Sequence, residues 1–182
     1  MSSADWRSAK RLALIGEAIK FIGVLEQTGH NDGPIIEQFQ KAVGGQAYGQ
    51  SYCMDFVQYC LQQVDKADPT TATCIFESQG CLEVFNKSPA YCHLLPSDFH
   101  KVVAGDVVVW EHCKAGKSTA LGHCGIIIGI GSGGSFTTVE ANTSSGTGIS
   151  RDGDGVYKRV RSLAGSDTMR VKGFLRCWAQ RK

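Results

Sequence analysis

Residues 50–61 read Gln50-Ser51-Tyr52-Cys53-Met54-Asp55-Phe56-Val57-Gln58-Tyr59-Cys60-Leu61, and this stretch decides the fold. From Cys53 to Val64 the apolar side chains recur at intervals of three and four, which predicts a helix with one buried face. Ser51 is a suitable N-cap residue. We therefore expect Cys53 in the first turn of this helix, and its end at Asp68-Pro69.

The position of Cys53 suggests chemistry as well as structure. A thiol in the first turn of a helix faces unpaired backbone N–H groups and the positive end of the helix dipole. Both favour the thiolate, which is the nucleophilic form, and the same N–H groups can stabilise an oxyanion. The alternative is that Cys53 is only the first core residue of the buried face.

The pattern on either side of this helix predicts an α+β fold. Residues 8–27 and 35–43 have helical apolar spacing. From Lys101 onward the pattern changes to alternation and continuous apolar runs, which predict strands; the expected strands are 106–110, 123–130, 136–141, 156–160 and 171–178. Helices followed by strands favour helices packed on a mostly antiparallel sheet of about five to six strands.

The length of 182 residues, without a repeat or a linker, predicts a single domain over residues 1–182. Residues 66–100 have weak periodicity, and we interpret them as a Cys-rich insertion with one short helix near residues 81–85. This segment contains Cys74, Cys81 and Cys92. A disulfide among these three is an open alternative, because the spacing does not determine a pairing.

Composition excludes several classes of partner. The net charge is +2, from 19 Lys and Arg against 17 Asp and Glu, so we expect no nucleic-acid partner. No apolar run approaches the ~20 residues that span a bilayer, so we expect no membrane partner. The first 26 residues lack the uninterrupted apolar region of a signal peptide, which predicts synthesis in the cytoplasm. We interpret the basic stretch 158–161 as a solvated surface.

Two downstream motifs supply the other parts of a cysteine nucleophile. They are Gly122-His123-Cys124-Gly125 and Val139-Glu140-Ala141-Asn142. Glu140 and Asn142 lie two apart, so on a strand they share one face, and either could orient the imidazole. We rank Glu140 first. Taken singly, each residue also has a non-catalytic interpretation. His123 could be a structural histidine, and Glu140 and Asn142 could be the polar end of a strand.

These motifs, with Ser51-Tyr52-Cys53-Met54-Asp55-Phe56-Val57 and Gly105-Asp106-Val107-Val108-Val109-Trp110, resemble the CHAP family in their order along residues 13–178. These are cysteine, histidine-dependent amidohydrolases and peptidases of papain-like architecture. The resemblance implies that Cys53 is the nucleophile, His123 the general base and then acid, Glu140 the orienting group, and Asn142 an auxiliary polar residue. We also expect substrate contacts from three residues: Gln50, Tyr52 and Trp110.

The resemblance implies cleavage of an amide bond in bacterial peptidoglycan, by an N-acetylmuramoyl-L-alanine amidase or an endopeptidase of the stem peptide or cross-bridge. We expect a monomer that acts as a phage lysin or an antibacterial effector, in the periplasm or cell wall after lysis or delivery. An effector would have an immunity protein as a partner. The alternatives are a non-catalytic wall-binding module and a transglutaminase-like acyl transferase.

We expect no cofactor and no metal. His112-Cys113 and His123-Cys124 could be drawn as four zinc ligands, but adjacent side chains on a strand point to opposite faces. Some members of the family bind calcium through acidic residues just before the nucleophile. Here residues 44–50 contain no carboxylate, so no such site is expected.

Overall fold

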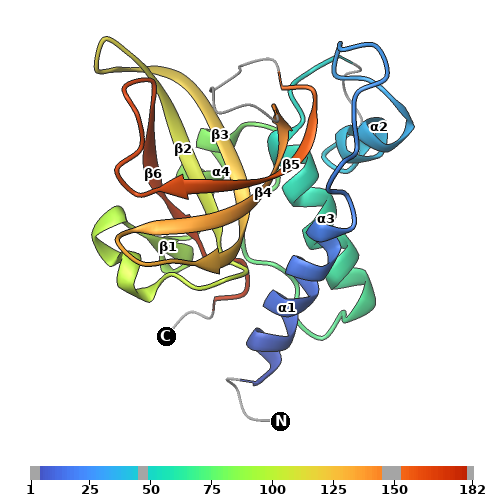
Figure 1. Cartoon of the computed structure of the whole chain (residues 1–182). Helices are drawn as coiled ribbons and strands as arrows, with labels where there is room; N and C mark the ends of the chain where they lie inside the picture. Colours follow the sequence, from blue (N-terminus) through green and yellow to red (C-terminus); the bar gives the residue numbers. More distant parts are fainter. Residues whose placement is uncertain (1–4, 45–48, 145–152, 180–182) are drawn as a thin grey trace.

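The chain forms most of its helices before its strands (Figure 1), and the computed structural model describes residues 5–44, 49–144 and 153–179. The α-helices are α1 (Asp5–Ile19), α2 (Pro34–Lys41), α3 (Cys53–Ala67) and α4 (Cys81–Lys87). Two 3-10 helices are η1 (Ala90–Cys92) and η2 (Pro96–Lys101). The strands are β1 (His93–Leu94), β2 (Val107–Lys114), β3 (Lys117–Ile130), β4 (Ser135–Thr143), β5 (Gly155–Ser162) and β6 (Met169–Leu175).

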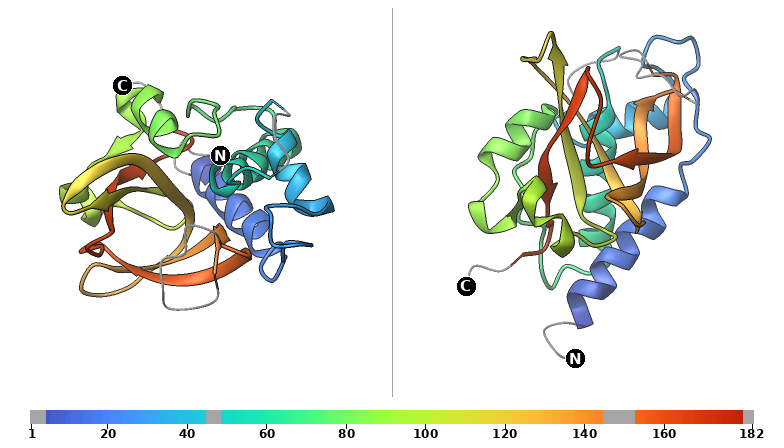
Figure 2. Two further views of the ribbon diagram at one scale, coloured as in Figure 1. Left: turned by 90° about the horizontal axis from the view of Figure 1, so that it is seen from above. Right: turned by 60° about the vertical axis from the view of Figure 1, so that its left-hand side comes forward.

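The six strands form one sheet in the order β1-β6-β2-β3-β4-β5, and every neighbouring pair is antiparallel. The α+β class predicted from the sequence is confirmed. The sheet curves strongly, and α1, α2 and α3 lie together on one side of it (Figure 2). Consecutive strands from β2 to β5 are neighbours, so the central part of the sheet is built from simple antiparallel connections.

Both faces of the sheet are buried, which explains the continuous apolar runs in its strands. Val107 and Val109 of β2 face the helices and join a core with Met54 and Phe56 of α3. The alternating positions of β2 face the inside of the curved sheet and form a second core; its fully or almost fully buried members include Val108, Trp110, Ile127, Phe136 and Phe174.

The first helix ends earlier than its apolar spacing predicts, at Ile19 rather than near residue 27. The chain that follows bonds to the start of β5: the N–H of Gly23 donates to the carbonyl of Val156, and the N–H of Val156 donates to the carbonyl of Val24. Gly23 has a φ of 93°, a conformation that glycine adopts at little cost. Sheet pairing thus replaces the last turns of the expected helix.

Residues 66–100 are integrated into the fold. They contain the end of α3, all of α4, η1 and strand β1, and all but the last residue of η2. β1 pairs with β6, and α4 contacts both β2 and β3. The short helix expected near residues 81–85 is confirmed as α4. None of the described helices is both long and apolar enough to cross a membrane.

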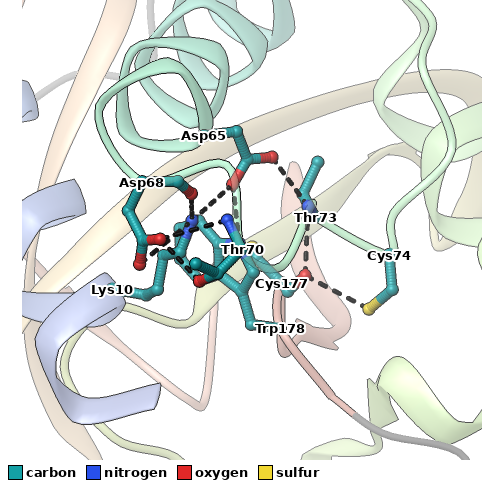
Figure 3. Close-up of polar contacts among 8 residues, drawn as sticks. All are labelled: Lys10, Asp65, Asp68, Thr70, Thr73, Cys74, Cys177 and Trp178. Atoms are coloured by element: carbon teal, nitrogen blue, oxygen red, sulfur yellow. Dashed lines mark hydrogen bonds and ion pairs between the residues drawn. The ribbon is translucent and has the colours of Figure 1, made fainter. Parts of the chain in front are cut away.

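A buried lysine connects α1 to the end of α3 (Figure 3). Lys10 is 2% exposed, and its Nζ lies 3.2 Å from Asp65 Oδ1 and 3.7 Å from Asp68 Oδ2. The same Asp65 accepts hydrogen bonds from Trp178 Nε1 at 2.9 Å and from the Thr73 N–H at 2.7 Å. One carboxylate therefore connects α1, α3, the segment after α3 and the segment after β6.

Replacing Lys10 by Met should lower the free energy of unfolding by about 2 kcal/mol, because the partly buried Asp65 carboxylate then loses its buried cation. Urea denaturation with fitted midpoints and slopes measures the loss. Lys20→Met is the matched control, since Lys20 pairs with Glu17 at the surface, where ion pairs contribute little. Equal midpoints for the two variants would contradict the role of Lys10.

Candidate active site

Cys53 is the first residue of α3, as predicted, but the N-cap residue is Tyr52 rather than Ser51. Tyr52 makes no side-chain cap, because its side chain is fully buried and its hydroxyl donates to Glu26 Oε1 at 3.1 Å. The expectation of a Ser51 cap is therefore wrong. Cys53 is 6% exposed and lines a pocket.

His123 on β3 connects Cys53 to Glu140. Its Nε2 lies 2.9 Å from Glu140 Oε2, and Cys53 is among the neighbouring groups that raise the pKa of the ring. Because Nε2 is held by the carboxylate, Nδ1 is the nitrogen that remains for the sulfur. The indole of Trp110 stacks on the imidazole with centroids 5.6 Å apart. The ring is thus oriented by Glu140 and Trp110.

Glu140 on β4 is fully buried and held in place by two further residues. Arg161 Nε donates to its Oε1 at 2.8 Å, and Arg161 Nη2 donates to its Oε2 at 2.5 Å. Thr138 Oγ1 donates to Oε1 at 2.5 Å. Gly125 makes room for this carboxylate, since a Cβ there would lie 2.7 Å from Glu140 Cγ.

The pKa shifts at the site favour a thiolate–imidazolium pair. Hydrogen bonds from Cys124 and Cys81, aided by His123, hold the pKa of Cys53 well below its ordinary value despite burial. Burial alone would lower the pKa of His123, but Cys53 and Glu140 raise that pKa to about 9. Burial opposes ionisation of Glu140 too, yet Arg161 and His123 lower its pKa to about 2. At neutral pH His123 and Glu140 are therefore charged, and the lowered pKa of Cys53 favours its thiolate.

Asn142 is brought to the site but does not hold the imidazole. It lines the pocket with Cys53 and His123, and its φ of 54° breaks the extended conformation of β4. The pairing of β4 with β5 shifts register between Glu140 and Thr143. Asn142 Oδ1 is buried without a hydrogen-bond partner among the described residues, so it is available to a bound group.

The three residues predicted to contact the substrate do not line the pocket that contains Cys53 and His123. The pocket has a volume of about 370 Å³ and is lined by Cys53, His123, Asn142, Arg161 and residues of the β2–β3 hairpin. Tyr52 and Trp110 are 0% and 1% exposed, so in this structure they are core residues that support the site. Gln50 is exposed, but it is not among the residues that line the pocket.

Two residues around the site, Arg161 and Cys81, were not among the predicted site residues, and Cys124 was considered only as a zinc ligand. We interpreted residues 158–161 as a solvated surface, whereas Arg159 and Arg161 are partly buried and Lys158 and Val160 exposed. Strand alternation was the available signal for Arg161. Cys81 carries no such signal, because its closeness to Cys53 depends on where α4 packs.

The stretch before the nucleophile, where some members of the family bind calcium, is described only in part. Residues 45–48 of the carboxylate-free stretch before the nucleophile lie outside the described residues. Elsewhere in the described residues, three potential metal ligands lie close together: Cys53, Cys81 and Cys124. Only one member of the zinc set considered in the sequence analysis, Cys124, is among these three.

The sequence model of the CHAP domain matches residues 43–142, more than half of the 182-residue chain. The chain therefore belongs to the CHAP domain family. Its structure is similar to a crystal structure of the wild-type endolysin LysIME-EF1, with a TM-score of 0.53 and 18% sequence identity. The match covers 93% of this chain but 65% of the endolysin chain, just under two thirds. No curated protein matches this chain.

Proposed function

We propose that this protein is a peptidoglycan hydrolase that cleaves an amide bond through Cys53. The observation that carries the proposal is the His123–Glu140 pair, 2.9 Å apart, in which His123 lines the same pocket as Cys53. Membership of the CHAP family and the similarity in fold to an endolysin support it. The bond is either the N-acetylmuramoyl-L-alanine amide or a peptide bond of the stem or cross-bridge.

In the proposed mechanism the Cys53 thiolate attacks the carbonyl carbon of the substrate amide. The imidazolium of His123 then donates its proton to the nitrogen that leaves, and a thioester to Cys53 remains. Neutral His123 next removes a proton from water, which attacks the thioester. Collapse releases the carboxylic acid product and restores the thiolate–imidazolium pair. Glu140 stays ionised throughout and stabilises the imidazolium.

Two groups are suited to the developing oxyanion. The first backbone N–H groups of α3 have no acceptor within the helix, and Cys53 lies at this end. Asn142 lines the same pocket, and its side-chain amide can donate a hydrogen bond. Donors already in place at the carbonyl oxygen lower the barrier without reorganisation.

We place this activity in a phage lysin or a delivered antibacterial effector that meets the cell wall after lysis or delivery. The exposed cation Lys114 in the lining of the pocket suits the carboxylate-bearing stem peptides of peptidoglycan. In the effector case an immunity protein would protect the producing cell by covering this pocket.

Purified sacculi test the proposal. The protein should release new amino termini and reduce turbidity, and Cys53→Ala should lower the rate by about 10⁴-fold or more. Mass spectrometry of the digest identifies the bond: free L-alanine amino termini indicate an amidase, and internal stem or bridge termini indicate an endopeptidase. Cys60→Ala, at another buried cysteine of α3, is the control. Full activity of Cys53→Ala would exclude this mechanism.

A non-catalytic wall-binding module predicts a different thiol chemistry. In the proposed enzyme, iodoacetamide should label Cys53 well ahead of the other thiols near neutral pH, because Cys53 has a lowered pKa and lines the pocket. Peptide mapping gives the order of labelling.

A further inference from the structure

Three cysteines from three separate elements meet beside the pocket. Cys53 begins α3, Cys81 begins α4, and Cys124 lies on β3. The three Sγ atoms lie within 4.8 Å of one another, and those of Cys53 and Cys81 are 3.4 Å apart. All three are buried. In the proposed hydrolysis Cys81 and Cys124 serve only to favour the Cys53 thiolate, but three converging thiols can also bind a ligand together.

A glycine allows this convergence. A Cβ at position 122 would lie 3.0 Å from Cys81 Cβ and 3.0 Å from Leu82 Cγ. The start of α4 therefore packs directly on the backbone of β3, and Cys81 reaches the space between Cys53 and Cys124. Ordinary side-chain packing would keep a helix further from a strand.

We propose that Cys53, Cys81 and Cys124 form a binding site for a thiophilic d¹⁰ cation of the Zn²⁺ class. Thiolates are the preferred ligands of such ions. Zinc–sulfur bonds of about 2.3 Å at tetrahedral angles place sulfur atoms about 3.8 Å apart. The separations in the cluster, from 3.4 Å to no more than 4.8 Å, bracket that value.

The surroundings provide an entrance and partial charge balance. Cys53 lines the pocket, so an ion can enter from that side and water can complete its coordination. Three thiolates balance the two charges of the ion and leave one negative charge on the site. The site is distinct from the His112-Cys113 and His123-Cys124 set considered from the sequence, because its other two ligands come from α3 and α4.

A metal ion bound at the three-cysteine site would affect catalysis. A sulfur lone pair that is bound to the ion cannot attack a carbonyl carbon, so the ion would inhibit any hydrolysis by Cys53. Metal binding itself does not depend on the proposed hydrolase activity, and the two can fail separately.

Zinc titration of the reduced, chelator-stripped protein under anaerobic conditions tests the site. With a chromophoric chelator as competitor, the wild type should bind one Zn²⁺ per chain through this cluster. Cys81→Ala and Cys124→Ala should each weaken binding by at least about 100-fold, the upper end of the effect of losing an outer-shell partner. Cys60→Ala is the matched control and should stay within about 3-fold of the wild type.

Cobalt substitution counts the sulfur ligands independently of activity. The thiolate-to-Co²⁺ absorption should fall in Cys81→Ala and Cys124→Ala and persist in Cys60→Ala. Thermal unfolding checks that each variant is folded. If Cys81→Ala does not fold, Cys81→Ser replaces it, because serine is close to cysteine in size but lacks the sulfur ligand. Unchanged zinc affinity in the Cys81 and Cys124 variants, or the absence of saturable binding in the wild type, would overturn the proposal.

Discussion

Glu140→Gln is expected to lower kcat/KM for peptidoglycan cleavage by about 10²- to 10³-fold. The two carboxylate oxygens of Glu140 accept hydrogen bonds from Arg161 and contact His123 and Thr138. In the variant, the glutamine NH₂ group would face the N–H groups of Arg161, so that one of these hydrogen bonds is lost. The negative charge that stabilises the imidazolium would be lost as well. The variant should also be less stable, since Arg161 loses its buried counter-charge.

The pH profile of this variant gives a readout that a purely structural role would not change. Activity needs protonated His123, so the rate of the wild type should fall as pH rises through about 9. Glu140 is one of the groups that raise the pKa of His123, so the alkaline limb should move to lower pH in Glu140→Gln. Glu111→Gln, at a carboxylate paired with Arg170 at 2.7 Å, is the control. An alkaline limb that does not move would refute the role of Glu140.

Asp55→Asn is expected to stabilise the protein, and increasingly so as pH rises. Asp55 is fully buried in the first turn of α3, and neither carboxylate oxygen has a hydrogen-bond partner among the described residues. Burial, reinforced by Cys53, raises the pKa of Asp55 to about 8. In the unfolded chain this carboxyl ionises near pH 4. Between these values the folded state binds the extra proton, so wild-type stability falls as pH rises from about 4 to about 8.

Asparagine titrates in neither state, so the variant escapes this loss. Its advantage should be small at pH 4 and reach on the order of 3–5 kcal/mol above pH 8, as measured by urea denaturation at several pH values. Glu83→Gln is the control, because Glu83 is an exposed residue of α4 whose pKa is lowered by Lys87. A stability difference between Asp55→Asn and wild type that does not change with pH would show that Asp55 is ionised in the folded protein.

Local pattern was sufficient to predict several elements. The spacing from Cys53 to Val64 predicted α3, and Cys53 is its first residue. The change of period after Lys101 predicted the strands that carry His123 and Glu140. The motif around His123 also contained Gly125, and the structure shows that this glycine leaves room for Glu140.

Other expectations failed where tertiary contacts decide. The first helix stops at Ile19 because the following residues pair with β5. Trp110 was expected at the substrate, yet the curvature of the sheet encloses it behind His123. Arg161 resembles a surface cation in the sequence, but its strand turns it toward Glu140.

The sequence by itself determined the class of fold and the kinds of chemical group that the chain can offer, because periodicity and residue type are local properties. Only the tertiary structure decided which groups meet. Cys81 lies 28 positions from Cys53, and Arg161 lies 21 from Glu140. Contacts over such separations depend on how helices pack and a sheet curves, and no local pattern encodes those distances.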